Sequence, residues 1–391
     1  MNKYIAPTAL ALPPSGIRRF FDLASMMENV ISLGVGEPDF ATPWVMRESA
    51  IYSIEQGQTM YTSNAGIIEL RRALAQNMQK SAGLHYDPET EILVTVGASE
   101  AIDLALRALI TPGDGILIPD PSFVAYAGAA ALAGADVRFV PLRAECDFRL
   151  QADDLRLAWT PNCKVLMISY PNNPTGAAMT RDELLPIARF VSENDLLVIS
   201  DEVYAELSYG EPHTAFATLP YMKNRTLHIN GFSKAYAMTG WRIGYVAAHP
   251  DFIRVMTRIH QYTIMCAPIM AQMAALEGLQ RGESAKKEMI REYDRRRRIM
   301  VHGFRAMGLP CFEPLGAFYT FPEISATGMS SEAFAEALLY EEKVAVVPGT
   351  AFGPGGEGHV RCSYAYAPEK IQEALERIER FVQRRVRANP A

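Results

Sequence analysis

Cysteine is scarce in this sequence, and its arrangement indicates neither a metal site nor a disulfide framework. The five cysteines are odd in number and widely spaced, without a Cys-x-x-Cys pair; they are Cys146, Cys163, Cys266, Cys311 and Cys362. The seven histidines are dispersed too, without the short spacing of metal ligands. We therefore expect no metal site and no structural disulfides, and a reducing cytoplasm is the simplest compartment.

Long apolar runs and an excess of basic residues are also absent. No stretch reaches the roughly 18 uninterrupted apolar residues of a membrane span, and prolines interrupt the short apolar run in residues 1–20. The formal net charge is -6, from 38 basic and 44 acidic residues, whereas a nucleic-acid-binding surface is normally basic. We expect a cytoplasmic protein that binds neither membranes nor nucleic acid.

The sequence does contain an alternation of short apolar, β-branched runs with amphipathic stretches of helical length. At 391 residues, 49% of them hydrophobic and 21% charged, the chain is long enough for two domains with sizeable cores. Strands are predicted at 91–97, 115–120, 136–142, 164–170, 196–201 and 226–231. Helical spacers such as 181–194 separate most of them, which predicts an α/β fold with a mostly parallel sheet covered on both faces.

After residue 250 the pattern becomes helical. The charged segment 286–308 is predicted to form a long helix that links two domains. Its run Arg295–Arg298 lies beside the acids Glu292 and Asp294, which indicates a solvated helix face rather than a basic binding patch.

The last ~90 residues predict a smaller α+β unit. Its strands are expected within 316–322, 343–349 and 359–365, and a closing amphipathic helix at 368–386. We predict a large domain over residues 46–285 and a discontinuous small domain over residues 1–45 and 286–391.

Polar side chains follow two of the predicted strands where ligands of such sheets collect. Asp201 ends a buried strand, with Tyr204 three residues later, and a buried carboxylate is costly unless a cation meets it. Lys234 follows the next strand among apolar and aromatic residues, with Arg242 after it. Such a lysine is a candidate for a lowered pKa and for Schiff-base chemistry.

Three further segments complete the pattern. The turn PNNPTG at 171–176 presents Asn172 and Asn173, and the glycine turn before Ala98 and Ser99 opens a helix whose amides can cradle an anion. Phe123 lies just beyond another strand, where it can stack on a flat ring. Each signal alone is weak, but together they supply a phosphate cradle, a stacking ring, a carboxylate, a lysine and a guanidinium at one edge of one sheet.

The order of these motifs resembles the class I/II aminotransferases of the aspartate aminotransferase family, which are fold type I pyridoxal-phosphate enzymes. The resemblance rests on GEPDF, GASE, PSF, NPTG, SDEVY, FSKAYAMTGWRIGY and VRCSYA, and covers about Ser15 to about Val386. It is greatest to prokaryotic aspartate and aromatic amino acid aminotransferases. It implies a large domain with a seven-stranded-type, mostly parallel sheet flanked by helices, and a smaller α+β domain.

The resemblance implies roles for the residues around pyridoxal 5'-phosphate. Lys234 is expected to hold the cofactor as an aldimine and then to move the substrate proton, Asp201 to pair with the ring nitrogen, and Phe123 to stack on the ring. Tyr204 and Asn173 are expected to bind the phenolic oxygen. The expected phosphate ligands are Ala98, Ser99, Ser233, Arg242 and, from the neighbouring subunit, Tyr61.

The same resemblance implies the reaction. Arg361 is expected to clamp the substrate carboxylate together with Asn173, and Gly36 to bring its backbone close to it. The amino group of an L-amino acid, aspartate or aromatic, would pass to a 2-oxo acid such as 2-oxoglutarate in a ping-pong sequence through a pyridoxamine intermediate. Because Tyr61 is expected to serve the opposite subunit, the active unit is expected to be a homodimer with shared sites.

Two other functions use the same motifs. A β-lyase needs the same carbanion and differs only in its products. A regulator that binds pyridoxal phosphate without turnover usually carries an added DNA-binding helical domain, for which there is no room before residue 30. The regulator is therefore disfavoured.

The sequence departs from the family pattern at three places. Gly231 stands where many relatives carry a phosphate-binding serine, and Phe123 stands where others use tryptophan or tyrosine. The segment 259–275, where dicarboxylate-specific members bring a second arginine from the partner subunit, contains no arginine or lysine. Arg18 or Arg19 is a candidate substitute, so the preferred amino donor stays open between aspartate, aromatic, aliphatic and other amino acids.

Overall fold

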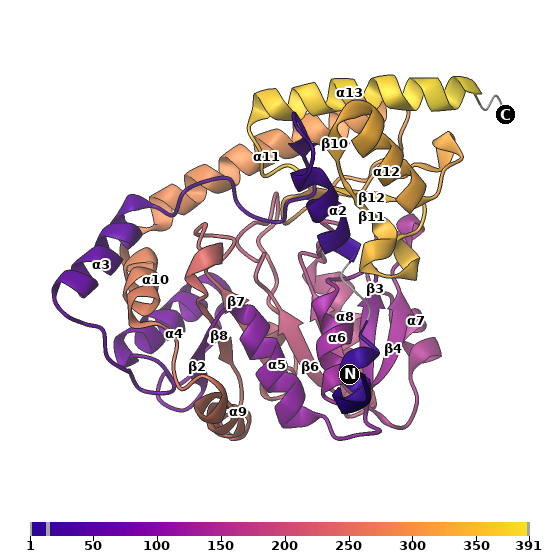
Figure 1. Ribbon diagram of the computed structural model, residues 1–391. Coiled ribbons are helices and arrows are strands. Elements are labelled where there is room, and N and C mark those ends of the chain that lie inside the picture. Colours follow the sequence, from indigo (N-terminus) through magenta and orange to yellow (C-terminus); the bar gives the residue numbers. More distant parts are fainter. Residues whose placement is uncertain (1, 13–15, 389–391) are drawn as a thin grey trace.

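The computed structural model describes residues 2–12 and 16–388. Its centre is a seven-stranded sheet in the order β2-β8-β7-β6-β5-β3-β4 (Figure 1). The strands are β2 (Ile92–Thr95), β3 (Gly115–Asp120), β4 (Asp136–Pro141), β5 (Cys163–Ser169), β6 (Leu197–Asp201), β7 (Thr226–Gly231) and β8 (Gly244–Ala247). Only β8 among them runs antiparallel to its neighbours, so the prediction of a mostly parallel sheet is confirmed.

Six of the seven strands coincide with predicted ones, and β8 was not predicted. Its four residues follow the motif TGWRIG so closely that no separate apolar run is visible in the sequence. Strand β8 forms because it pairs with β7, in a register that places Gly231 opposite Gly244. A side chain on Gly244 would meet the backbone nitrogen of Ala98 at 2.5 Å, so glycine lets β8 pass the start of the next helix.

Helices cover both faces of this sheet, as parallel strands require. Alternate residues of β5 point to opposite sides: Leu166 and Ile168 belong to one core cluster, and Val165 and Met167 to the other. The first cluster includes residues of α7 (Ala152–Ala158) and α8 (Arg181–Glu193). The second includes residues of α5 (Ala98–Leu109), α6 (Ala125–Leu132) and α9 (Pro250–Thr263).

A third layer of helices lies beside the β2 edge of the sheet (Figure 1). In it α10 (Ile269–Arg281) packs against α3 (Trp44–Glu55) and α4 (Ile68–Ala82). From there α11 (Glu283–Ala306) runs toward the C-terminal part of the fold, as predicted for the linking helix (Figure 1).

The solvated face expected for Arg295–Arg298 is wrong for its two middle residues. Arg296 and Arg297 are buried, because α11 turns that side toward the fold. Arg296 pairs with Asp39 at 2.8 Å and Arg297 with Glu313 at 2.7 Å, so both charges are compensated.

The smaller unit joins both ends of the chain. Strand β1 (Ile31–Ser32) pairs in parallel with β10 (Val344–Ala345), and β11 (Val347–Pro348), β12 (Val360–Ser363) and β9 (Tyr319–Thr320) form a second small sheet. The helices of this unit are α2 (Gly16–Ser25), α12 (Ser331–Glu342) and α13 (Pro368–Ala388). This pairing agrees with a discontinuous small domain, but its exact limits stay a prediction. The expected outer residues 1 and 391, and Ser15, lie outside the described residues.

Short elements complete the chain. The helix α1 (Pro7–Leu10) contacts α6. The 3-10 helices are η1 (Asn2–Tyr4), η2 (Ala144–Cys146), η3 (Phe216–Thr218), η4 (Lys223–Arg225), η5 (Thr239–Trp241), η6 (Ser325–Thr327), η7 (Gly349–Phe352) and η8 (Pro354–Gly356). Within residues 2–12 and 16–388, no helix combines the length and the apolar character needed to cross a membrane.

Candidate active site

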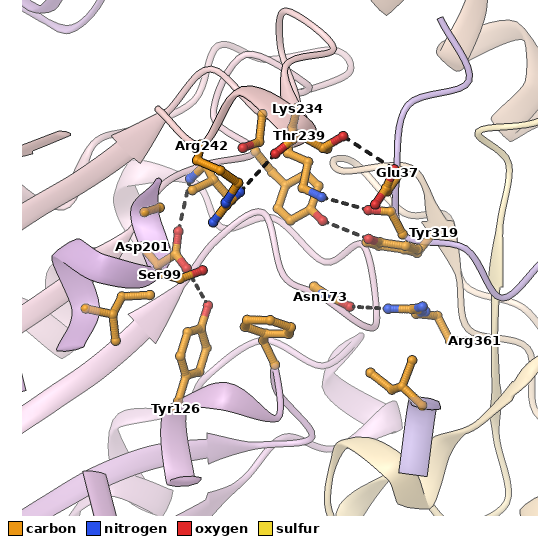
Figure 2. Close-up of a pocket in the computed structure, with 18 of the residues that line it drawn as sticks. Glu37, Ser99, Tyr126, Asn173, Asp201, Lys234, Thr239, Arg242, Tyr319 and Arg361 are labelled. Carbon is orange, nitrogen blue, oxygen red and sulfur yellow. Dashed lines mark hydrogen bonds between the residues drawn. The ribbon is translucent and has the colours of Figure 1, made fainter. Parts of the chain in front are cut away.

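A cavity of about 320 Å³ lies where the carboxyl ends of the central strands meet the smaller unit (Figure 2). Parallel strands bring the residues that follow them to one edge, so positions far apart in sequence meet there. Eleven of the predicted site residues line it: Gly36, Ala98, Ser99, Phe123, Asn173, Asp201, Tyr204, Ser233, Lys234, Arg242 and Arg361. Tyr61 does not.

Lys234 reaches the cavity from the turn after β7. Its Nζ donates a hydrogen bond to the backbone oxygen of Gly36 at 2.7 Å and lies 5.7 Å from the ring centre of Tyr204. Burial lowers the pKa of Lys234 to about 8; the charge of Glu37 opposes this shift and that of Arg361 adds to it. The amine can therefore lose its proton close to neutral pH, as a base or nucleophile must.

Asp201 ends β6 and is only 5% exposed. One carboxylate oxygen accepts from the Tyr126 hydroxyl at 2.7 Å, and the other accepts from the Val203 backbone nitrogen at 3.2 Å. Burial raises the pKa of Asp201, although these hydrogen bonds oppose the shift. No basic side chain of the described residues forms an ion pair with it, so the carboxylate suits a cationic ligand group.

An anion cradle lies at the start of α5. Ala98 and Ser99 form the first turn of this twelve-residue helix, where free backbone N–H groups favour negative charge. The Arg242 guanidinium packs directly over Gly97: a Cβ on Gly97 would meet Arg242 Nη2 at 2.6 Å. Helix amides, a guanidinium and the Ser233 hydroxyl thus converge on one part of the cavity.

Arg361 faces the same cavity from β12 and is 2% exposed. Its Nη1 donates to the side-chain oxygen of Asn173 at 2.9 Å, and its Nη2 donates to the backbone oxygen of Gly34 at 2.6 Å. Its Nε is buried without a hydrogen-bond partner. No carboxylate among the described residues pairs with this guanidinium, so the arrangement suits an anionic ligand.

The sequence did not reveal every lining residue. Tyr126, which holds Asp201, lies one helical turn after Phe123, and that spacing was the available signal. Tyr319 lies in the predicted strand 316–322, where an aromatic residue reads simply as core. The other unpredicted lining residues are Ile17, Phe21, Glu37, Ile102, Val203 and Thr239.

The candidate arginines of the N-terminal segment lie away from the cavity. Arg19 pairs with Glu332 at 3.5 Å, and neither it nor Arg18 lines the cavity. Helix α2 instead presents Ile17 and Phe21 to it. The helix period places the apolar residues and the arginines on different faces of α2. The helix therefore gives the cavity apolar side chains and not the second cation expected for a side-chain carboxylate.

Known proteins resemble the chain along most of its length. The family described as aminotransferase class I and II matches residues 28–378. YugH of Bacillus subtilis (strain 168) is 51% identical over 98% of this chain and 99% of its own length. An aspartate aminotransferase of Pyrococcus abyssi (strain GE5 / Orsay) is 46% identical, over 94% and 96%. The crystal structure of an aromatic aminotransferase from Pyrococcus horikoshii OT3 has a TM-score of 0.90 at 46% identity, covering 94% of this chain and 99% of that one.

Proposed function

Because the chain belongs to the class I and II aminotransferase family, we propose that it uses pyridoxal phosphate to move the amino group of an L-amino acid to a 2-oxo acid such as 2-oxoglutarate. The observation that carries the proposal is a single cavity in which Lys234, Asp201 and Arg361 each lack a usual counter-charge. The lysine suits a carbonyl group, the aspartate a protonated ring nitrogen, and the arginine a carboxylate.

The described residues fit pyridoxal phosphate at each of its polar groups. When bound, the cofactor supplies an electron-poor ring that stabilises negative charge at the substrate α-carbon. Asp201 would hold the ring nitrogen, and Tyr204 and Asn173 would bind the phenolic oxygen. Phe123 would stack on the ring, and the phosphate would lie against the cradle formed by Ala98, Ser99, Ser233 and Arg242.

Lys234 would hold the cofactor and, once released, move the α-proton of the substrate. A lysine does this only as a neutral amine, and burial supplies that condition by lowering its pKa to about 8. Its contact with the Gly36 oxygen keeps the amine above the cavity. Because the same pocket would serve the donor and then the acceptor, we propose a ping-pong order of substrates.

Arg361 would bind the substrate carboxylate. Its unpaired Nε and its Nη1, now on Asn173, are the donors available for this contact. Glycine at position 36 lets the backbone lie beside Arg361, because an added Cβ would meet the Tyr319 hydroxyl at 2.8 Å.

We propose an aromatic or other apolar amino donor ahead of aspartate. Ile17 and Phe21 of α2, together with Ile102 and Phe123, give the cavity an apolar lining. Among the described lining residues the only cations are Lys234, Arg242 and Arg361, and each already has a role. A side-chain carboxylate would therefore lack a dedicated partner within one subunit.

The active unit is proposed to be a homodimer. Tyr61 is 78% exposed, beside the exposed Met60 and a groove that includes Ile264 and Ile269. Exposed aromatic and aliphatic side chains gathered near a site mark a contact surface. From the partner, Tyr61 would reach the phosphate cradle. The cytoplasmic location expected from the scattered cysteines stays a prediction.

An absorbance titration tests the function. The purified protein, loaded with pyridoxal phosphate, would be mixed with single L-amino acids in the absence of a 2-oxo acid. We expect phenylalanine or tyrosine to bleach the cofactor band at lower concentration than aspartate, and 2-oxoglutarate to restore it. The Lys234→Ala variant should show no such response.

Other outcomes change the conclusion. A band that persists while ammonia and a 2-oxo acid accumulate would indicate the β-lyase instead. Failure of the wild-type chain to take up pyridoxal phosphate would reject the proposal.

A further inference from the structure

We propose that Tyr319 is a positioning residue whose hydroxyl fixes the hydrogen bond of Tyr204 and whose ring supports Arg361. The proposal rests on the proposed function, because Tyr204 is taken to face the cofactor. It assigns two tasks to one side chain, and the hydroxyl can be removed without the ring.

Tyr319 lines the cavity and contacts both Tyr204 and Arg361. It is 1% exposed on β9, and its hydroxyl oxygen is 2.7 Å from that of Tyr204. The Arg361 guanidinium lies 4.5 Å from the centre of its ring. Figure 2 shows Tyr319 and Arg361 on the same side of the cavity, with Lys234 above them. No other described lining residue makes both a hydrogen bond to Tyr204 and a ring contact with Arg361.

Counting protons gives the direction of the Tyr319–Tyr204 hydrogen bond. Each phenol has one O–H, and burial raises the pKa of both, so both stay protonated at neutral pH. An oxyanion facing Tyr204 can only accept, so the Tyr204 hydroxyl donates its hydrogen bond to it. The Tyr204 oxygen must then accept from Tyr319. The resulting chain of donors, Tyr319 to Tyr204 to oxyanion, is polarised in one direction.

The space around the hydroxyl shows that its place is specific. A Cβ on Gly36 would lie 2.8 Å from the Tyr319 hydroxyl oxygen, closer than side chains tolerate. Only glycine at position 36 therefore lets this hydroxyl reach Tyr204. A phenylalanine at position 319 would keep the ring and remove only the hydrogen bond to Tyr204, so the two contributions can be tested apart.

The ring has the second task. Arg361 lies between the rings of Tyr319 and Phe352, at 4.5 and 4.7 Å. Aromatic faces hold a guanidinium in place without using its hydrogen-bond donors. The rings therefore leave the unpaired Nε, and the Nη1 now on Asn173, for a substrate carboxylate.

Two variants separate the tasks. Tyr319→Phe removes only the hydroxyl, and Tyr319→Leu removes the ring as well. The first readout is the pH midpoint of the visible absorbance band of bound pyridoxal phosphate, without substrate. The second is the dissociation constant of 3-phenylpropionate, a carboxylate that has no amino group to react.

We expect Tyr319→Phe to raise the pH midpoint by about one unit, because an oxyanion with a weaker donor holds a neighbouring proton more tightly. Its 3-phenylpropionate affinity should stay within about twofold of the wild-type value, since the ring remains. Tyr319→Leu should raise the midpoint similarly and weaken 3-phenylpropionate roughly tenfold.

Two controls make the result specific. Tyr209→Phe also removes a buried hydroxyl, one that donates to the Ala317 oxygen at 2.6 Å outside the described cavity lining, and should not move the midpoint. Because Tyr319 acts through Tyr204, adding Tyr319→Phe to Tyr204→Phe should cause no further shift.

An unshifted midpoint in Tyr319→Phe, or fully additive shifts in the double variant, would overturn the proposal. If the wild-type protein binds pyridoxal phosphate and transaminates, either of these variant results would leave the proposed function intact. A wild-type protein without a cofactor band would instead reject the function itself.

Discussion

Individual charged residues in the cavity lower the folding stability of the cofactor-free protein, and a bound ligand of opposite charge would remove this cost. Asp201 and Arg361 are buried with hydrogen bonds but without an opposite charge, and burial lowers the pKa of Lys234 to about 8. Such arrangements are typical of functional sites, because a fold selected only for stability would pair these groups. The cost can be measured at Lys234.

Replacing Lys234 by methionine should stabilise the cofactor-free protein near pH 7. The folded pKa of about 8 lies below the unfolded value, so between them the unfolded chain binds more protons. The free energy of unfolding of the wild-type protein should therefore rise as the pH goes from about 8 to about 10. Lys234→Met should be more stable than the wild type by at most about 3 kcal/mol at pH 7, and this difference should vanish near pH 10. Urea unfolding at pH 7 and pH 10 measures this difference.

The exposed Lys80 of α4 provides the control, since Lys80→Met should change stability little at either pH. Equal stability of wild type and Lys234→Met at pH 7 would contradict the expected cost.

Gly97 is the residue on which the anion cradle depends. It has φ of 78°, and a Cβ would collide with Arg242 Nη2. Gly97→Ala should displace the guanidinium and weaken pyridoxal phosphate binding roughly tenfold or more, besides costing about 1 kcal/mol of backbone strain. Cofactor dissociation constants, measured from the absorbance of the bound form, would report the effect.

Gly83 controls for the positive φ alone: its φ is 69°, its ψ is 18° against 163° at Gly97, and nothing lies within 4 Å of an added Cβ. Gly83→Ala should lose stability through backbone strain but keep the wild-type affinity for pyridoxal phosphate. If both variants bind the cofactor as the wild type does, Arg242 is not part of the cradle.

At the scale of elements, a buried ionic cluster holds β6 and β7 together behind the cavity. Glu202, 1% exposed, contacts His213 at 2.7 Å and His228 of β7 at 3.3 Å, and accepts from Ser200 of β6 at 2.8 Å. Burial alone would raise the pKa of Glu202, but the two histidines lower it below its usual range. Burial alone would lower the pKa of His228, but Glu202 raises it. Because Glu202 follows Asp201, this cluster also anchors the strand end that carries Asp201.

Glu202→Gln should cost about 3 kcal/mol or more at pH 6 and less at pH 9. A raised histidine pKa contributes stability below its unfolded value of about 6.5 and loses it as pH rises, so the pair is strongest on the acid side. Urea unfolding of the variant and the wild type at both values measures the loss.

The exposed Glu211 of the same loop supplies the control, as Glu211→Gln should be close to neutral. A loss that is the same at pH 6 and pH 9 would show that the contact between Glu202 and His228 contributes no pH-dependent stability.

At the scale of the whole molecule, the site is expected to be completed by a second copy. The Tyr61 side chain is too exposed to act in its own subunit's cavity, which it does not line. If it serves the partner, Lys234→Ala and Tyr61→Ala remove different halves of each shared site.

Mixing the Lys234→Ala and Tyr61→Ala variants should therefore restore activity. A hybrid dimer contains one site with both Lys234 and Tyr61, so random exchange should recover about a quarter of the wild-type rate. The rate of transamination after mixing, with sedimentation to verify the dimer, tests this. No recovery despite subunit exchange would show that Tyr61 acts within its own chain or not at all.

Much of this architecture was predictable because strand ends carry readable signals. An apolar run followed by one polar residue identified Asp201 and Lys234 without any tertiary information. The parallel sheet then makes such residues neighbours, and eleven of the twelve predicted positions do line one cavity. The twelfth, Tyr61, does not line it, and its expected role in the partner's site stays a prediction.

The sequence by itself determined the order of strands and helices, the lysine and the charges that follow the strands, because these depend on local periodicity and residue chemistry. Arg296 and Arg297 lie three and four residues after the apolar Tyr293, so the helix period already places both on the buried face of α11. Only the tertiary structure decided what compensates them, because Asp39 and Glu313 lie outside this helix. Tertiary structure also decided the pairing of Tyr319 with Tyr204, since two strand-end aromatics 115 positions apart meet only when the smaller unit packs on the sheet.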